Sequence, residues 1–134
     1  GDKNKTQFEV SPFVTVSMGD DVEQCMMPIR ANMALYIGGM GARDKNFYNN
    51  YAKALGFADA AVEIQDLFLA GRKDEAAAAV PAELIDACHL VGPAERIKER
   101  LQRWKTAGNN GQVASMLLGC QQPEALELIA SEVL

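Results

Sequence analysis

Residues 8–21, FEVSPFVTVSMGDD, decide the fold. Apolar side chains occupy both odd and even positions of Phe8–Met18, and this pattern predicts a strand with both faces covered. Strands of that kind occur in parallel sheets that helices flank on each side. Pro12 cannot donate a ladder hydrogen bond, so we expect it near the start of the strand or at a sheet edge. Gly19 then ends the strand, and the acidic pair after it opens a helix.

Helices are predicted for most of the chain that follows. Apolar residues recur at helical spacing from Asp20 to the glycine-rich run at 38–41, which ends the first helix. Asn46 is expected to cap the next helix, which Gly56 ends. The aromatic residues of that short helix are expected to pack inside this region: Phe47, Tyr48 and Tyr51. Further helices are predicted at 60–71, 74–80, 82–87, 93–108 and 122–134.

Only one other strand is predicted, at Val113–Leu118, together with a short extended stretch at Cys88–Val91. Two strands cannot form a self-sufficient sheet. The chain also begins at Gly1 without an initiator methionine. No repeat or linker divides it, so we expect residues 1–134 to be a single unit that was cut from a longer protein.

Composition and charge narrow the possible partners. The 134 residues carry 13 basic and 18 acidic side chains, for a net charge of −5, and the cations are interspersed with acids. This pattern argues against nucleic acid as a partner. No apolar run is long enough to span a membrane. The three cysteines and the single histidine lack zinc-ligand spacing, and without a targeting segment reduced thiols in the cytoplasm are the expectation.

Two stretches carry a resemblance to a known family. The first is LYIGGMGARDKNFYN at 35–49, and the second runs from IQDL at 64–67 through AGRKDEAAAAVP at 70–81 to LVGPAER at 90–96. Together they resemble the carboxyl-terminal part of luciferase-like monooxygenases, in the branch of deazaflavin-dependent oxidoreductases. The resemblance extends over about Phe8–Leu134. The sequence departs from the family pattern at 109–112, which intervenes before the last strand and leaves the start and register of that strand open.

The resemblance implies an α/β fold, a mostly helical fragment of a (β/α)8 TIM barrel. Phe8–Met18 then resembles barrel strand seven, and Asp20–Ala87 resembles a helical insertion. Pro93–Ala107 resembles helix seven, Val113–Leu118 strand eight, and Gln122–Leu134 the last helix. Such a barrel needs about 250 residues, so strands one to six are absent from this chain.

The resemblance also implies a chemistry. Family members transfer hydride between reduced coenzyme F420, or FMN in relatives, and a small organic substrate, and active sites of such barrels lie at the carboxyl ends of the strands. Candidate cofactor-binding residues at or near this rim are Ser17, Gly19, Arg43, Lys45, His89 and Gly92. Each has a plainer alternative: a strand-to-helix turn, a solvated loop, a structural histidine or a simple helix start. No catalytic constellation of residues is present in the sequence, so the enzyme hypothesis rests on resemblance.

A second hypothesis treats the chain as a non-enzymatic oligomerisation or interaction module. An apolar strand without neighbours favours self-association, so a homo-oligomer is expected. On this hypothesis the isolated fragment is inactive. A variant of the enzyme hypothesis uses FMN in place of coenzyme F420, and the residues present do not separate the two cofactors.

Overall fold

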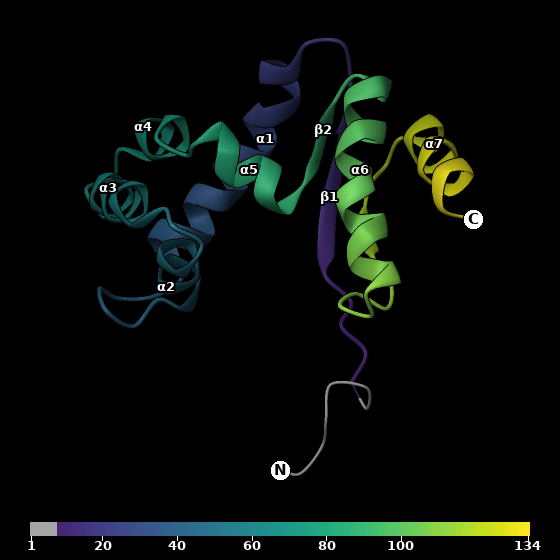
Figure 1. The fold of residues 1–134 in the computed structure, drawn as a ribbon. Helices are drawn as coiled ribbons and strands as arrows, with labels where there is room; N and C mark the ends of the chain where they lie inside the picture. Colours follow the sequence, from purple (N-terminus) through teal and green to yellow (C-terminus); the bar gives the residue numbers. More distant parts are fainter. Residues whose placement is uncertain (1–7) are drawn as a thin grey trace. The chain divides into compact units, whose positions relative to one another are not determined.

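The computed structural model describes residues 8–134, which divide into two compact units. The first unit combines the residues up to Val22 with Cys88–Leu134, and the second is Glu23–Ala87. Figure 1 labels the elements of both. The sequence does not signal this division, because neither junction has a proline-rich or glycine-rich linker.

A three-stranded parallel sheet forms the centre of the first unit. Its strands are β1 (Phe13–Met18), β2 (Leu90–Gly92) and β3 (Leu117–Gly119), in the order β2-β1-β3. The expected parallel sheet is therefore present, but it has three strands where two were predicted. The third, β2, comes from the stretch that was expected only to be extended.

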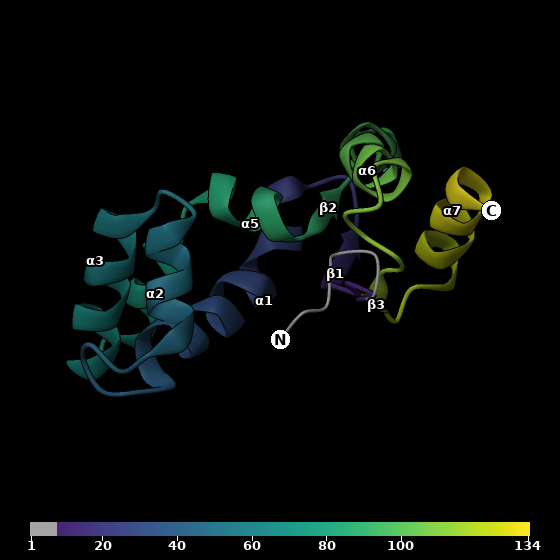
Figure 2. The same cartoon turned by 60° about the horizontal axis from the view of Figure 1, so that its bottom comes forward.

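Two helices cover one face of this sheet. They are α6 (Ala94–Asn109) and α7 (Pro123–Val133), and both views show them on the same side of the strands (Figures 1 and 2). The buried core residues here are Val14, Val16, Leu90, Ile97, Leu101, Ala125 and Ile129. Burial of each large aliphatic side chain contributes about 1.5–3 kcal/mol. This one-sided core holds the sheet together.

The helices of the first unit leave the opposite face of the sheet uncovered, so within this unit only one of the two apolar faces of the strand has a partner. Phe13 and Leu117 lie opposite each other in the register and remain 66% and 54% exposed. Their ring and side chain point away from α6 and α7, which pack on the even-numbered residues of β1. Apolar residues at both odd and even positions show that each face of the strand is suited to burial. They do not show which part of the protein buries each face.

Both predicted strands are too long at their amino-terminal ends. Before β1, the carbonyls of Val10 and Pro12 accept hydrogen bonds from the amides of Ala114 and Leu117, each at 2.9 Å, without regular strand pairing. Pro12 ends this irregular part directly before β1, as expected for a residue without an amide hydrogen. The last strand begins at Leu117 instead of Val113, in the region where the sequence left the register open.

The second unit is helical. It contains α1 (Val22–Ala34, entered from the first unit), the π-helical turn η2 (Leu35–Gly39), α2 (Phe47–Ala54), α3 (Ala58–Leu69), α4 (Lys73–Ala78) and α5 (Ala82–Cys88, which leads back to the first unit). Helices α2 and α3 run side by side (Figure 2). Gly56 and Gly71 follow α2 and α3 with φ of 97° and 81°, which residues with a side chain rarely adopt. The predicted ends of these helices are thereby confirmed.

The glycine-rich run 38–41 belongs to the π-helical turn and its exit. A side chain at Gly38 would place its Cβ 2.5 Å from the Cβ of Phe68, and one at Gly39 would lie 2.4 Å from the same ring. Glycine is therefore needed there so that η2 can approach α3 closely. Two glycines of the family-like motif thus have a packing role.

Two buried asparagines satisfy the carbonyls of this turn. The side-chain amide of Asn46 donates to the carbonyls of Tyr36 and Ile37 at 2.9 and 3.0 Å. Asn49 donates to the carbonyls of Ile37 and Ala61 at 3.1 and 2.7 Å. The predicted cap is confirmed, because the Oδ1 atom of Asn46 accepts from the amide of Asn49.

The aromatic residues of α2 do not pack in an interior, which corrects the prediction. Phe47, Tyr48 and Tyr51 are 72%, 41% and 53% exposed, and they contact one another at the surface. The buried side of α2 is formed instead by the small residues Asn49 and Ala52. Their small size allows α2 to lie close to η2 and α3, so the bulky rings take the outer side.

Candidate functional site

The carboxyl ends of β1 and β2 bring three predicted site residues together. Ser17 lies opposite Val91 in the register, and Met18 lies opposite Gly92. The pairing continues one step further, since the amide of Gly19 donates to the carbonyl of Gly92 at 3.2 Å. Ser17, Gly19 and Gly92 therefore form one edge of the sheet, as their positions in the sequence suggested.

Ser17 lies on the open face of the sheet. It shares the odd-numbered side of β1 with Phe13 and Thr15, whereas Val14 and Val16 pack against α6 and α7. Its side chain is half-buried. Ser17 thus lies at the carboxyl end of the central strand, on the face that the helices of this unit leave uncovered.

Gly92 has a backbone conformation and surroundings that exclude a side chain. Its φ is 108°, and a Cβ there would lie 3.0 Å from Cδ of Arg96 and 3.1 Å from Cγ2 of Val22. The guanidinium of Arg96 donates to the carbonyl of Val91 at 2.5 Å, which fixes the turn from β2 into α6. Only glycine allows this tight turn at the edge of the sheet.

Helix α6 begins directly at this turn. Pro93 is its N-cap residue and supplies no side-chain hydrogen bond to the first turn. The amides of a first helical turn lack partners within the helix, and the helix dipole adds positive potential there. The amino-terminal end of α6 can therefore attract a negatively charged group that approaches the carboxyl edge of β2.

Gln122 completes the edge on the other side of β1. Its side-chain Oε1 accepts from the amide of Met18, and its Nε2 donates to the carbonyl of Met18, both at 2.8 Å. Sequence reasoning placed Gln122 only at the start of the last helix and missed this role. No local pattern could have revealed it, since the two residues are 104 positions apart.

His89 takes a structural place beside the sheet. Its Nδ1 accepts from the amide of Thr15 at 3.1 Å, so the ring is neutral and carries its proton on Nε2. Burial lowers the pKa of His89 below the usual value for histidine. Because Val16 pairs with Leu90, His89 lies level with Thr15 and before the carboxyl edge that Ser17 and Gly92 form.

Arg43 and Lys45 belong to the second unit, on the loop between η2 and α2. Arg43 forms an ion pair with Asp66 of α3 at the surface. Lys45 is exposed, and Asp44 between them has a φ of 64°. The contacts within the described residues do not join these two cations to the sheet edge.

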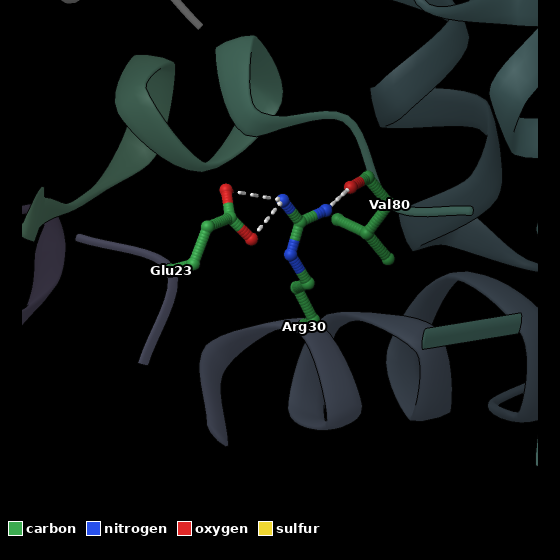
Figure 3. A network of polar contacts seen from close by, with 3 residues as sticks. All are labelled: Glu23, Arg30 and Val80. Atoms are coloured by element: carbon green, nitrogen blue, oxygen red, sulfur yellow. Dashed lines mark hydrogen bonds and ion pairs between the residues drawn. The ribbon is translucent and has the colours of Figure 1, made fainter. Parts of the chain in front are cut away.

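A half-buried arginine in the second unit was not singled out from the sequence. The Arg30 side chain is 15% exposed, binds the carboxylate of Glu23 at 3.2 Å and donates to the carbonyl of Val80 (Figure 3). A hollow of about 480 Å³ borders this pair, lined also by Met27 and Asp74. Because Glu23 neutralises the guanidinium and Asp74 adds a second carboxylate, the hollow is poorly suited to anions.

The described residues hold few other groups for catalysis. Within residues 8–134, no cluster of three or more histidine, cysteine, aspartate or glutamate side chains could hold a metal ion. Burial raises the pKa of the Cys88 thiol, so this sulfur stays protonated and weakly nucleophilic near neutral pH. Among the helices that the structure describes, none is long and apolar enough to cross a membrane.

Comparisons with known proteins identify the family of this chain. The family model for luciferase-like monooxygenases matches residues 2–111, and the chain belongs to that family. It is also 34% identical, over 106 residues, to a Mycobacterium tuberculosis protein named "Putative coenzyme F420-dependent oxidoreductase". The match covers 79% of this chain and 30% of that relative. The matched region is therefore about a third of the relative's length. No solved structure matches the sequence.

Membership of the family relates the sheet edge to the position of active sites in barrel enzymes. A mostly helical chain with a small parallel sheet is consistent with a part of a luciferase-like barrel. In enzymes of that architecture the active site lies at the carboxyl ends of the parallel strands. Ser17, Gly19 and Gly92 occupy such ends here.

Proposed function

We propose that this chain is the carboxyl-terminal part of an oxidoreductase that transfers hydride between coenzyme F420 and a small organic substrate. The observation that carries the proposal is the convergence of Ser17, Gly19 and Gly92 at the carboxyl edge of a parallel sheet. The name of the Mycobacterium tuberculosis relative supports F420 over other cofactors. On this proposal β1 is barrel strand seven and β3 is strand eight.

The residues at the edge suit a cofactor with a flat ring and an anionic group. Gly92 allows the tight turn from β2, so α6 begins directly at the sheet edge. The first turn of α6 can hold the negative charge, and the Ser17 hydroxyl can donate or accept a hydrogen bond. When bound, coenzyme F420 supplies the hydride chemistry, and these residues bind and orient it.

The two cations of the loop between η2 and α2, Arg43 and Lys45, have a smaller role in this proposal. Lys45 and Arg43 are proposed to bind acidic groups on their own loop in the second unit, where Arg43 first exchanges its ion pair with Asp66. Exposed ion pairs of this kind contribute about 0–1 kcal/mol, so the exchange costs little. His89 is proposed only as a hydrogen-bond donor through Nε2, because its Nδ1 is occupied by Thr15.

The proposal is tested by titrating the full-length protein with coenzyme F420 and, separately, with FMN. Saturable quenching or a shift of the F420 absorbance is expected, together with weaker or no binding of FMN. Gly92→Val should weaken F420 binding by at least about tenfold, because its side chain collides with Arg96 and Val22 and displaces the turn that leads into α6. Tight FMN binding with no response to F420 would overturn the cofactor assignment and favour the FMN alternative.

A second candidate role is self-association through the open sheet face. Phe13 and Leu117 present an apolar surface beside a strand edge. Such surfaces are rarely left in contact with water in a stable monomer. We therefore propose that the isolated 134-residue chain forms homo-oligomers, whether or not its parent protein binds a cofactor.

A further inference from the structure

We propose that Gln122 is a positioning residue that sets the carboxyl end of β1 and, through it, the geometry of the cofactor-binding edge. The inference rests on the proposed function for its link to the cofactor. Its structural part, the pairing of Gln122 with Met18, is independent of that function.

The hydrogen bonds of β1 alternate between its two neighbours. Odd-numbered residues face β2, since the amide of Thr15 reaches His89 and that of Gly19 reaches Gly92. Even-numbered residues face the other side, where the carbonyl of Pro12 accepts from the amide of Leu117 in β3. The amide and carbonyl of Met18 therefore both point toward the β3 side.

Strand β3 ends too early to pair with Met18. Its last residue, Gly119, lies opposite Thr15, three residues before Met18. The primary amide of Gln122 takes the missing place, since it offers one acceptor and one donor in the arrangement of a backbone peptide group. The strand is thus extended by a side chain.

The pairing of Gln122 with Met18 affects the proposed site because of where Met18 lies. Met18 lies between Ser17 and Gly19, the two edge residues that β1 contributes, and its backbone fixes the direction in which both leave the strand. Gln122 is itself held because it is the N-cap residue of α7, whose Ala125 and Ile129 are anchored in the core. The rigid helix therefore transmits its position to the edge.

The substitution Gln122→Glu tests the pairing by its charge. A glutamate carboxylate can still accept from the amide of Met18, but it cannot donate to the Met18 carbonyl and places negative charge against it. Protonation of the glutamate restores a donor. Gln121→Glu is the matched control, because Gln121 is the exposed neighbour and receives the same change in charge.

The experiment measures F420 affinity of the full-length wild type, Gln122→Glu, Gln122→Met and Gln121→Glu between pH 8 and pH 5. At pH 8, Gln122→Glu and Gln122→Met should bind at least about tenfold more weakly than wild type, and Gln121→Glu should not. The Met18 carbonyl disfavours the charged carboxylate and should raise the pKa of the new glutamate above its usual value of about 4.3. Relative to wild type at the same pH, Gln122→Glu should therefore recover in part as the pH falls toward 5, and Gln122→Met should not. Dividing the affinity of each variant by that of wild type at the same pH cancels the pH effects that arise from titration of the cofactor and of His89.

Amide hydrogen exchange supplies a readout that needs no cofactor. The amide of Met18 should exchange at least about tenfold faster in Gln122→Met at pH 8 than in Gln121→Glu, because methionine offers it no acceptor, with the core of α6 unchanged. Gln122→Glu keeps an acceptor for this amide, so a smaller increase is expected there. Faster exchange with the expected affinity pattern supports the proposal. Unchanged exchange at Met18, or equal affinity in folded variants, overturns it. A wild type without F420 binding would contradict the proposed function instead, and the exchange result would still decide whether Gln122 sets the edge.

Discussion

The Nδ1 atom of His89 accepts a hydrogen bond from the backbone amide of Thr15 at 3.1 Å. His89 directly precedes β2, so its ring extends the pairing between β2 and β1 at their amino-terminal end. Gln122 extends the pairing of β1 at the opposite end and on the opposite side. Two side chains thus complete a sheet whose outer strands are only three residues long.

The first prediction concerns pH. Burial lowers the pKa of His89 in the folded protein below the value of about 6.5 that it has when unfolded, so the unfolded state binds the proton more readily. The contribution of neutral His89 is therefore complete above about pH 6.5 and is lost as the pH falls through the folded-state pKa. The melting temperature of the 134-residue chain should decline as the pH falls from 6.5 toward 5.

The matched variant for this prediction is His89→Gln, whose carbonyl oxygen can accept from Thr15 but does not titrate. Its melting temperature should change less than that of wild type between pH 8 and pH 5, since most carboxylates titrate below this range. This chain has no other histidine. Parallel pH profiles for the two proteins would show that His89 does not contribute this dependence.

The second prediction concerns the close approach of η2 to α3. Gly38→Ala places a methyl group 2.5 Å from Cβ of Phe68, and it should destabilise the protein by about 1–3 kcal/mol in urea denaturation. Gly108→Ala serves as control, because its nearest neighbour lies 3.8 Å away and α6 includes this position. Alanine is favoured over glycine in a helix, so the control should be neutral or more stable by up to about 1 kcal/mol. Equal effects of the two substitutions would refute the packing role of Gly38.

The third prediction concerns the buried amide of Asn49. Asn49→Leu removes the side-chain donor to the Ala61 carbonyl and one of the two side-chain donors to the Ile37 carbonyl, which keeps Asn46. The free energy of unfolding should fall by about 1–3 kcal/mol. Asn50→Leu is the control on the same helix, where the side chain is exposed. It should change stability by less than about 0.5 kcal/mol in the same urea titration. A small effect of Asn49→Leu would mean that water replaces the amide at this turn.

The fourth prediction concerns the open sheet face. The isolated 134-residue chain should form dimers or larger species in light scattering, and Leu117→Ser should shift the distribution toward smaller ones. Leu117 is 54% exposed, so its replacement removes apolar surface without opening the core. Ser131→Ala, at an exposed position of α7, should leave the distribution unchanged. A stable, folded monomer of the original chain would contradict the proposed self-association.

Residue pattern alone predicted the parallel sheet and most of the helices. Local chemistry decides these features: the apolar run that becomes β1, the Asn46 cap, and the glycines that end α2 and α3. The long-range contacts escaped prediction, because nothing near Gln122 or Arg30 in the sequence indicates Met18 or Val80 as a partner. The aromatic residues of α2 were misplaced because hydrophobicity predicts a tendency to be buried, and here small residues take the inner side of the helix.

The candidate site was predicted to a similar extent. Ser17, Gly19 and Gly92 were found because strand ends of a parallel sheet meet at one edge, which is a general property of such sheets. His89 was expected near this edge, and the register places it level with Thr15 instead. A difference of two or three residues along a strand moves a side chain by about 7–10 Å, and residue pattern does not fix register that closely.

Hydrogen exchange of the full-length protein with and without coenzyme F420 tests the proposed site most directly. If the carboxyl edge of β1 and β2 holds the cofactor, the amides of Ala94 and Glu95 in the first turn of α6 should become protected when F420 binds. The amides at the carboxyl-terminal end of α6, residues 103–109, should change little, which provides an internal control at the far end of the same helix. Binding of F420 that leaves the edge amides unprotected would contradict the assignment of Ser17, Gly19 and Gly92 to the cofactor site.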